Sequence, residues 1–161
     1  MKALLFGLIT LCAAATAVAE DAWRLHRGPW FAVEAPATFT MTTLADAVAD
    51  DGPMTVRFDA PNGEIAFFLH APLWATPTNA AQAKPGEVLL GEERATVHGD
   101  LVTWRTWRDP QTGRQRSFRM VEESEGASLT VYGVEYADAA VLARWRPAYL
   151  RFVRSVQRFA D

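Results

Sequence analysis

The stretch that decides the fold is DAAVLARWRPAYLRFVRSVQRF, residues 138–159 near the C-terminus. Its apolar side chains recur at steps of three and four residues: Val141, Leu142, Trp145, Tyr149, Phe152, Val153, Val156 and Phe159. The charged side chains on the opposite side are arginines: Arg144, Arg151, Arg154 and Arg158. Asp138 stands where a side chain can cap the first turn. The pattern predicts an amphipathic helix whose apolar stripe is buried against another layer.

Pro147 lies in the middle of this stretch. Proline removes a backbone donor and crowds the preceding turn, but it is accepted in the first turn of a helix. We therefore predict a short first helix or a kink near Trp145, followed by a continuous second helix that starts at Pro147.

The layer that receives the helix is encoded just upstream. Four strand-like runs, 87–97, 101–108, 114–123 and 127–136, are separated by short turn segments. Strands joined so closely pair as antiparallel neighbours. Phe118 and Met120 alternate with Ser117 and Arg119, so one side of the sheet faces inward and the other outward. The sequence thus predicts an α+β domain, an antiparallel meander packed by a C-terminal helix.

Earlier runs extend this sheet. Residues 55–60 and 64–71 flank Pro61-Asn62-Gly63, where Asn-Gly supplies the positive φ angles of a tight hairpin. Residues 65–69 are apolar on both sides, as expected of an inner strand, and residues 30–35 form another strand that ends at Pro36. The proline-rich stretch 73–87 is predicted to be a loop, or a loop with one helical turn.

The first residues resemble an export signal. Lys2 precedes an apolar run from Ala3 to Leu11, and Ala17-Val18-Ala19 is a small-x-small cleavage site. A membrane anchor needs about 20 apolar residues, so we expect residues 1–19 to be removed as a signal peptide. Residues 20–161 then form one domain, without a membrane span, that is periplasmic or secreted. Cys12 is the single cysteine, so the mature domain has no disulfide or thiol chemistry.

The most suggestive surface feature is a group of arginines. The formal net charge of −3 gives no general attraction to nucleic acid, but every basic residue after position 100 is arginine. Arg105, Arg116 and Arg119 lie on one predicted hairpin together with Trp107, and guanidinium groups stack on indoles and grip carboxylates or phosphates. These four are our candidates for a ligand- or partner-binding site. The alternative is a solvated strand surface on which the arginines pair with Glu122, Glu123 and their neighbours.

No catalytic centre is recognisable. None of the serines lies in a Gly-x-Ser-x-Gly context, and His26, His70 and His98 are too dispersed for a local zinc pattern. The acidic stretch around Asp46 and Asp50 lacks the spacing of a calcium-binding loop. We predict no catalytic residues, no metal site and no cofactor.

Taken as a whole, the mature chain resembles the PsbP-like fold. The resemblance is carried by the aromatic strand 30–36 that ends in proline, the hairpin 60–68, the meander, and the final helix with Tyr149, Phe152 and Phe159. This group includes the extrinsic subunit of the photosynthetic oxygen-evolving complex, the DcrB-like periplasmic proteins and a nuclear transport cofactor. It implies an antiparallel sheet between helical layers, an α/β/α sandwich, in proteins that are mostly accessory or binding factors. No site residue of those proteins is transferred.

Three functional hypotheses follow. The first is an exported, non-catalytic accessory or binding protein of the cell envelope, which recognises a protein or a small anionic ligand through a sheet edge, the 73–87 loop or the arginine hairpin. The second is an envelope hydrolase or metal-assisted enzyme that combines His70 and His98 from separate strands. The third is a carrier of a hydrophobic ligand, since the chain has six tryptophans and nine phenylalanines.

Overall fold

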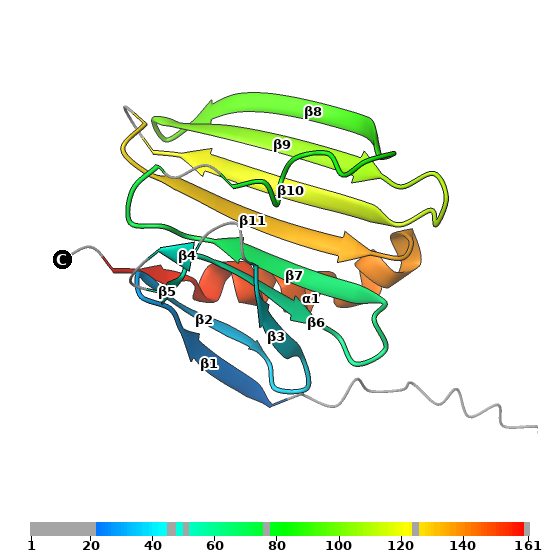
Figure 1. The fold of residues 1–161 in the computed structure, drawn as a ribbon, viewed down its shortest axis with the longest axis horizontal. Coiled ribbons are helices and arrows are strands. Elements are labelled where there is room, and N and C mark those ends of the chain that lie inside the picture. The colour runs from blue at the N-terminus through cyan, green and yellow to red at the C-terminus, as the bar shows by residue number, and fades with distance from the viewer. Residues whose placement is uncertain (1–21, 45–47, 50–51, 76–77, 124–125, 160–161) are drawn as a thin grey trace, which may run out of the picture.

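A seven-stranded antiparallel sheet forms the centre of the molecule (Figure 1). The structure is a computed structural model that describes residues 22–44, 48–49, 52–75, 78–123 and 126–159. The predicted signal peptide and the acidic stretch at Asp46 and Asp50 lie outside the described residues. The strands, in spatial order, are β3 (Thr40–Thr43), β6 (Thr55–Asp59), β7 (Ile65–His70), β11 (Leu129–Tyr136), β10 (Gln115–Glu122), β9 (Asp100–Arg108) and β8 (Val88–Val97).

The predicted meander is confirmed. β8 pairs with β9, β9 with β10, and β10 with β11, each antiparallel. β11 then pairs with β7, and β7 with β6. The hairpin 55–71 therefore joins the meander through its second strand. Residues 71–87 contain no helix or strand among those described, as their prolines indicate.

The C-terminal stretch forms one helix, α1 (Ala139–Ser155), and Pro147 lies inside it. The backbone N–H of Val141 donates to the Asp138 carboxylate at 2.9 Å, which confirms the predicted cap. Of the two predicted alternatives, a separate short first helix is wrong, because one helix runs through Pro147, and the kink near Trp145 stays a prediction. The apolar stripe on both sides of Pro147, from Val141 to Phe152, packs into a single core. That burial outweighs the missing backbone hydrogen bond and keeps the two halves in one helix.

Beyond Ser155 the chain leaves the helix and becomes β12 (Gln157–Arg158), which pairs with β2 (Phe31–Pro36). β2 also pairs with β1 (Trp23–Arg27), so these three strands form a small second sheet. The predicted strand at 30–35 is confirmed as β2, whereas β1 and β12 carry too few apolar residues for the sequence to indicate them. Phe159 is 36% exposed and does not belong to the helical stripe, contrary to our prediction.

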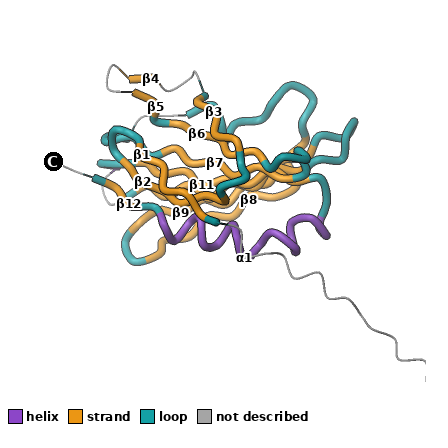
Figure 2. Tube along the Cα trace, turned by 90° about the horizontal axis from the view of Figure 1, so that it is seen from below, coloured by secondary structure: helices purple, strands orange, loops and turns teal. Residues whose placement is uncertain are grey.

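The central strands of the large sheet are buried on both sides, most fully at β7. On the helix face, Phe67 and Val134 share a core with Phe152 of α1 and Phe31 of β2, and Figure 2 shows α1 lying along this side of the strands. The opposite side, here called the loop face, carries a smaller core that includes Phe118. Ala81, from the segment 78–87, completes that smaller core. The family resemblance implied a second helical layer at this position, and the described residues place the segment 78–87, made of turns and bends, there instead.

Two further short strands, β4 (Val48–Ala49) and β5 (Gly52–Pro53), pair with each other. No helix in the described part of the chain is long and apolar enough to cross a lipid bilayer. The α+β class, an antiparallel sheet with a C-terminal helix, is as the sequence predicts.

The hairpin at Asn62-Gly63 is wider than the predicted tight turn. Gly63 alone has a positive φ, 67°, and the loop runs from Ala60 to Glu64 between β6 and β7. Asn62 uses its side chain rather than a left-handed backbone, since its Oδ1 accepts the N–H of Glu64 at 3.2 Å. Asparagine is common in turns because it tolerates the left-handed backbone and because its side chain can accept a backbone hydrogen bond. Asn62 is in this turn for the second reason.

The tight turn lies instead between β8 and β9, where His98 and Gly99 have φ angles of 54° and 96°. Two successive positive φ angles are typical of a type I′ turn, for which Asn-Gly is the preferred pair. We expect His98→Asn to raise the free energy of unfolding by about 0.5 kcal/mol, because asparagine tolerates this backbone better. His98→Val should lower it by about 1–2 kcal/mol, since a β-branched residue is disfavoured there. Urea unfolding of both variants checks the two opposite signs.

Candidate functional site

The candidate site is the loop face, where the segment 78–87 crosses the sheet. The indole N–H of Trp107, on β9, donates to the carbonyl oxygen of Ala81 at 3.0 Å. The segment thereby divides this face into two hollows. The C-terminal half of the segment, from Lys84 to Glu87, lines the first hollow, and its N-terminal half, with Thr78, Ala81 and Gln82, lines the second hollow.

Arg116, on β10, holds the segment in place. Its guanidinium donates to the carbonyl oxygens of Ala80 and Gln82, each at 2.7 Å, and forms a two-pronged ion pair with the Glu87 carboxylate. Both side chains of this pair are almost fully buried. Burial alone would raise the pKa of Glu87, but the hydrogen bonds and charge of Arg116 overcome it and the pKa is lowered. The pair therefore fastens the segment at both of its ends.

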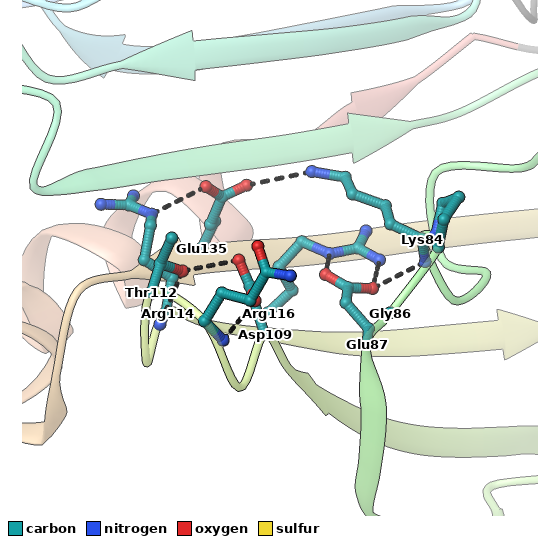
Figure 3. Close-up of a pocket in the computed structure, with 10 residues that line it drawn as sticks. Lys84, Gly86, Glu87, Asp109, Thr112, Arg114, Arg116 and Glu135 are labelled. Carbon is teal, nitrogen blue, oxygen red and sulfur yellow. Dashed lines mark hydrogen bonds and ion pairs between the residues drawn. The ribbon is translucent and has the colours of Figure 1, made fainter.

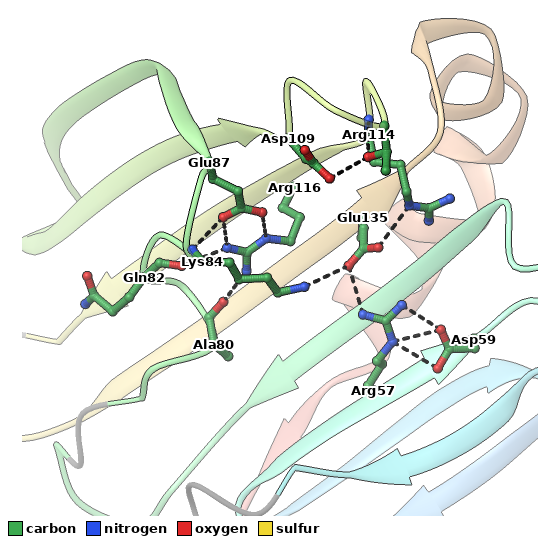
Figure 4. A network of polar contacts seen from close by, with 11 residues as sticks. Arg57, Asp59, Ala80, Gln82, Lys84, Glu87, Asp109, Arg114, Arg116 and Glu135 are labelled. Atoms are coloured by element: carbon green, nitrogen blue, oxygen red, sulfur yellow. Dashed lines mark hydrogen bonds and ion pairs between the residues drawn. The ribbon is translucent and has the colours of Figure 1, made fainter.

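A second group of charges centres on Glu135 of β11 (Figure 4). Its carboxylate accepts hydrogen bonds from Arg57 at 2.9 Å and Arg114 at 3.1 Å, and Lys84 lies 3.7 Å away. Asp59 holds Arg57 from its other side. Burial opposes ionisation of Glu135, yet the bonds and charge of Arg57, with the charge of Lys84, lower its pKa. Glu135 is thus ionised at neutral pH and links β6, β11 and the turn before β10 to the segment.

The first hollow, of about 220 Å³, lies between these two groups (Figure 3). Its charged lining consists of Lys84, Glu87, Asp109, Arg114, Arg116 and Glu135. Positive and negative groups are equal in number, and each of the three cations contacts a carboxylate. Asp109 is occupied within its own turn, because it accepts from Thr112 Oγ1 at 2.7 Å. The charges here satisfy one another and serve to fasten the segment.

The second hollow, of about 430 Å³, has a different character. Its apolar lining comes from the segment and from three strands or their ends: Ala81, Leu101, Met120, Leu129 and Val131. Leu101 is 40% exposed, which is unusual for a leucine that faces other apolar groups. Arg94 and Arg105 lie on one side of the hollow, and Glu122 also contributes to its lining.

The two arginines share a single carboxylate. Arg105 reaches Glu92 at 2.6 Å, and Arg94 reaches the other oxygen of Glu92 at 2.8 Å. The hydrogen bond from Arg105, with the charges of both arginines, lowers the pKa of Glu92. Arg105 also lies over the ring of Trp107, 5.7 Å from its centroid. The cluster of Glu92 with two guanidinium groups carries a net positive charge beside an apolar surface.

The four predicted binding residues are divided between the two faces. Arg116 pairs with Trp107 across the strands, and Arg105 pairs with Phe118, so these side chains share the loop face. Arg119 pairs with Trp104 and lies over the Tyr132 ring, 5.8 Å from its centroid, on the helix face. Strand alternation separates residues that differ by an odd number of positions. Of the four, Arg105 alone borders the second hollow, and the role of all four in binding stays a prediction.

Sequence reasoning missed the acidic residues that organise this face. Glu87, Glu92 and Glu135 lie on different strands or strand ends, and each meets its arginine through the tertiary fold. Glu92 and Arg105 occupy paired positions of one hairpin, so the register of β8 and β9 would have indicated that contact. The predicted alternative named Glu122 and Glu123 as partners of the hairpin arginines, but Arg105 and Arg116 pair with Glu92 and Glu87 instead. Glu123 pairs with Arg158 of β12 at 2.7 Å.

The histidines do not form a common site. His70 is buried at the end of β7, where its Nδ1 lies 2.7 Å from Thr55 Oγ1. His98 is in the β8–β9 turn, and β11, β10 and β9 separate β7 from β8. His26 lies on β1, against the Phe58 ring. Within the described ranges, no group of three or more potential metal ligands is present.

Comparison with known proteins yields a likeness of fold. No protein-family model matches the chain, and no curated protein matches its sequence. The solution structure of cyanobacterial PsbP (CyanoP) from Synechocystis sp. PCC 6803 superposes with a TM-score of 0.52 at 9% identity, covering 92% of this chain and 99% of that one. A Pseudomonas aeruginosa protein of unknown function, described as a putative regulator, gives a TM-score of 0.40 at 15% identity, covering 86% and 99%. The comparison with CyanoP, together with the topology above, shows that this chain has a PsbP-like fold.

Proposed function

We propose that this protein is a non-catalytic binding protein, exported to the periplasm or secreted, that holds a small ligand in the second hollow of the loop face. The ligand has an apolar body and an anionic group. The observation that carries the proposal is the open apolar lining at Leu101, Met120 and Leu129 beside Arg94 and Arg105. Small-molecule sites typically combine such a lining with a few polar groups that set orientation.

The volume and the charge both support this assignment. About 430 Å³ falls within the usual size of ligand sites. The two arginines share Glu92, so that cluster has one positive charge in excess, and Glu122 is the opposing charge in the lining. A carboxylate or phosphate can displace part of the Glu92 contact and be gripped in a fork by Arg105. An accessory or carrier role is consistent with the export signal predicted for residues 1–19 and with the PsbP-like fold.

Binding is tested with anilinonaphthalene sulfonate, a fluorescent probe with an apolar body and one anionic group. We expect saturable binding that decanoate displaces better than decanol, because only decanoate carries a charge for Arg105. Arg105→Gln should weaken decanoate binding about tenfold, as expected for one lost hydrogen bond to a charged group. Decanol affinity should stay the same in that variant.

Leu101→Asp should abolish the probe signal, because it places a charge in the apolar lining. Leu150→Asp is the matched control, since Leu150 has a similar exposure of 37% but lies on α1. Equal loss of binding in the two leucine variants would contradict the assignment of the hollow. Equal displacement by decanoate and decanol would contradict the anionic part.

A further inference from the structure

β8 forms one edge of the seven-stranded sheet, and within that sheet it pairs with β9 alone. The backbone donors and acceptors along its outer side can therefore accept another strand. Ten residues, Val88–Val97, make it the longest strand of the sheet, and most of them are exposed. Long exposed edges are the parts of a sheet most disposed to pair with another chain.

The edge carries three charged residues and a bulge, but it lacks other usual protection against pairing. Its sequence, VLLGEERATV, contains no proline and no lysine, the residues that natural edge strands use against association. Val88, Leu89 and Leu90 are 46%, 47% and 50% exposed in direct succession. A bulge between Leu89 and Gly91 interrupts the register, but Gly91 to Val97 pair regularly with β9. The regular part of the edge is thus open to a partner strand.

The charges of this part are complementary to a second copy of themselves. Glu92 and Arg94 are two positions apart and share the loop face, as their 2.8 Å contact shows. If two β8 strands pair antiparallel about a two-fold axis through Glu93, Glu92 of each copy lies opposite Arg94 of the other. Opposite charges in facing positions stabilise strand pairing.

We propose that β8 pairs with β8 of a second copy of this chain, so that two sheets join into one continuous sheet. A two-fold interface of this kind buries the same surface on each subunit. Arg94 and Arg105 border the second hollow in each copy, so the two hollows lie on the same side of the joined sheet. The proposal is independent of the ligand, because it rests on the strand edge and its charges.

Glu93, which lies on the proposed two-fold axis, makes this arrangement testable by substitution. Glu93 meets Glu93 of the second copy, and like charges in facing positions oppose pairing. Glu93→Gln should therefore strengthen the dimer severalfold. Arg94→Glu places two carboxylates opposite each other on both sides of the axis, and should weaken the dimer about tenfold or more.

Sedimentation equilibrium of the purified protein and the two variants measures these changes. Arg146→Glu is the control for net charge, because Arg146 is an exposed residue of α1 that no part of the proposed interface contacts. Circular dichroism confirms that each variant is folded, as expected because the Arg94–Glu92 pair is exposed and contributes little. A dimer that Glu93→Gln tightens and Arg94→Glu loosens supports the proposal. A monomeric wild-type protein, or equal effects of Arg94→Glu and Arg146→Glu, overturns it.

Discussion

Replacing Arg116 with methionine is expected to lower the free energy of unfolding by about 3–5 kcal/mol. The change leaves the buried Glu87 carboxylate without its cation, and an unpaired buried charge is far more costly than the pair itself is stabilising. It also removes the donors from the carbonyl oxygens of Ala80 and Gln82. Denaturant unfolding measures the loss, and hydrogen exchange of residues 78–87 reports release of the segment.

Two controls separate this effect from the loss of any arginine. Arg94→Met removes an exposed cation with a partly exposed partner, and should cost less than about 1 kcal/mol. The double variant Arg116→Met, Glu87→Met should recover much of the loss, because no unpaired charge then remains in the interior. If Arg116→Met costs no more than Arg94→Met, Arg116 does not fasten the segment, and the ligand-binding role first predicted for it regains weight.

The parts of the fold that follow from local pattern were predicted from the sequence. The turn residues and the alternation around Phe118 were enough to predict the meander strands. The three- and four-residue spacing of apolar residues was enough to predict the helix. The continuity of the helix through Pro147 could not be predicted from the local pattern. Pro147 favours a break when considered alone, whereas the core formed by Val141, Tyr149 and Phe152 favours continuity. Tertiary burial decided the outcome, and it is not a local property.

The candidate site was only partly predictable, for a related reason. The arginines of one hairpin are adjacent in sequence, but the face that each one occupies depends on strand register. Arg119 differs from Arg116 by three positions, and so it lies on the helix face with Tyr132. Glu92 pairs with Arg105 within the β8–β9 hairpin, and Glu135 of β11 pairs with Arg114 just before β10. Glu87, the partner of Arg116, comes from the end of the segment, and no spacing rule in a single sequence connects Arg116 with Glu87.

The two sides of the sheet thus have different roles. The helix face holds most of the large buried aromatic rings and stabilises the domain. The loop face has the smaller core, the fastened segment and the open hollow beside Arg105. The same division predicts where a single truncation has its largest effect on stability.

Phe152→Ala is expected to lower the free energy of unfolding by about 3–5 kcal/mol. Phe152 is 0% exposed, and its ring centroid lies 5.2 Å from that of Phe67 on β7 and 5.5 Å from that of Phe58 on β6. Truncation removes the transfer free energy of the ring and leaves a cavity that a helix fixed on a sheet cannot close. Since domains of this size are stable by about 5–15 kcal/mol, the variant should be close to unfolding.

Phe159→Ala is the control, because it removes the same side chain from a position that is 36% exposed. It should change stability by less than about 1 kcal/mol. Phe152→Leu keeps most of the apolar volume and should fall between the two. Urea unfolding orders the three variants. If Phe152→Ala and Phe159→Ala have equal effects, α1 is not anchored through Phe152. The sheet would then have to be stable without its helix, which would contradict an α+β domain built on the stripe of residues 138–155.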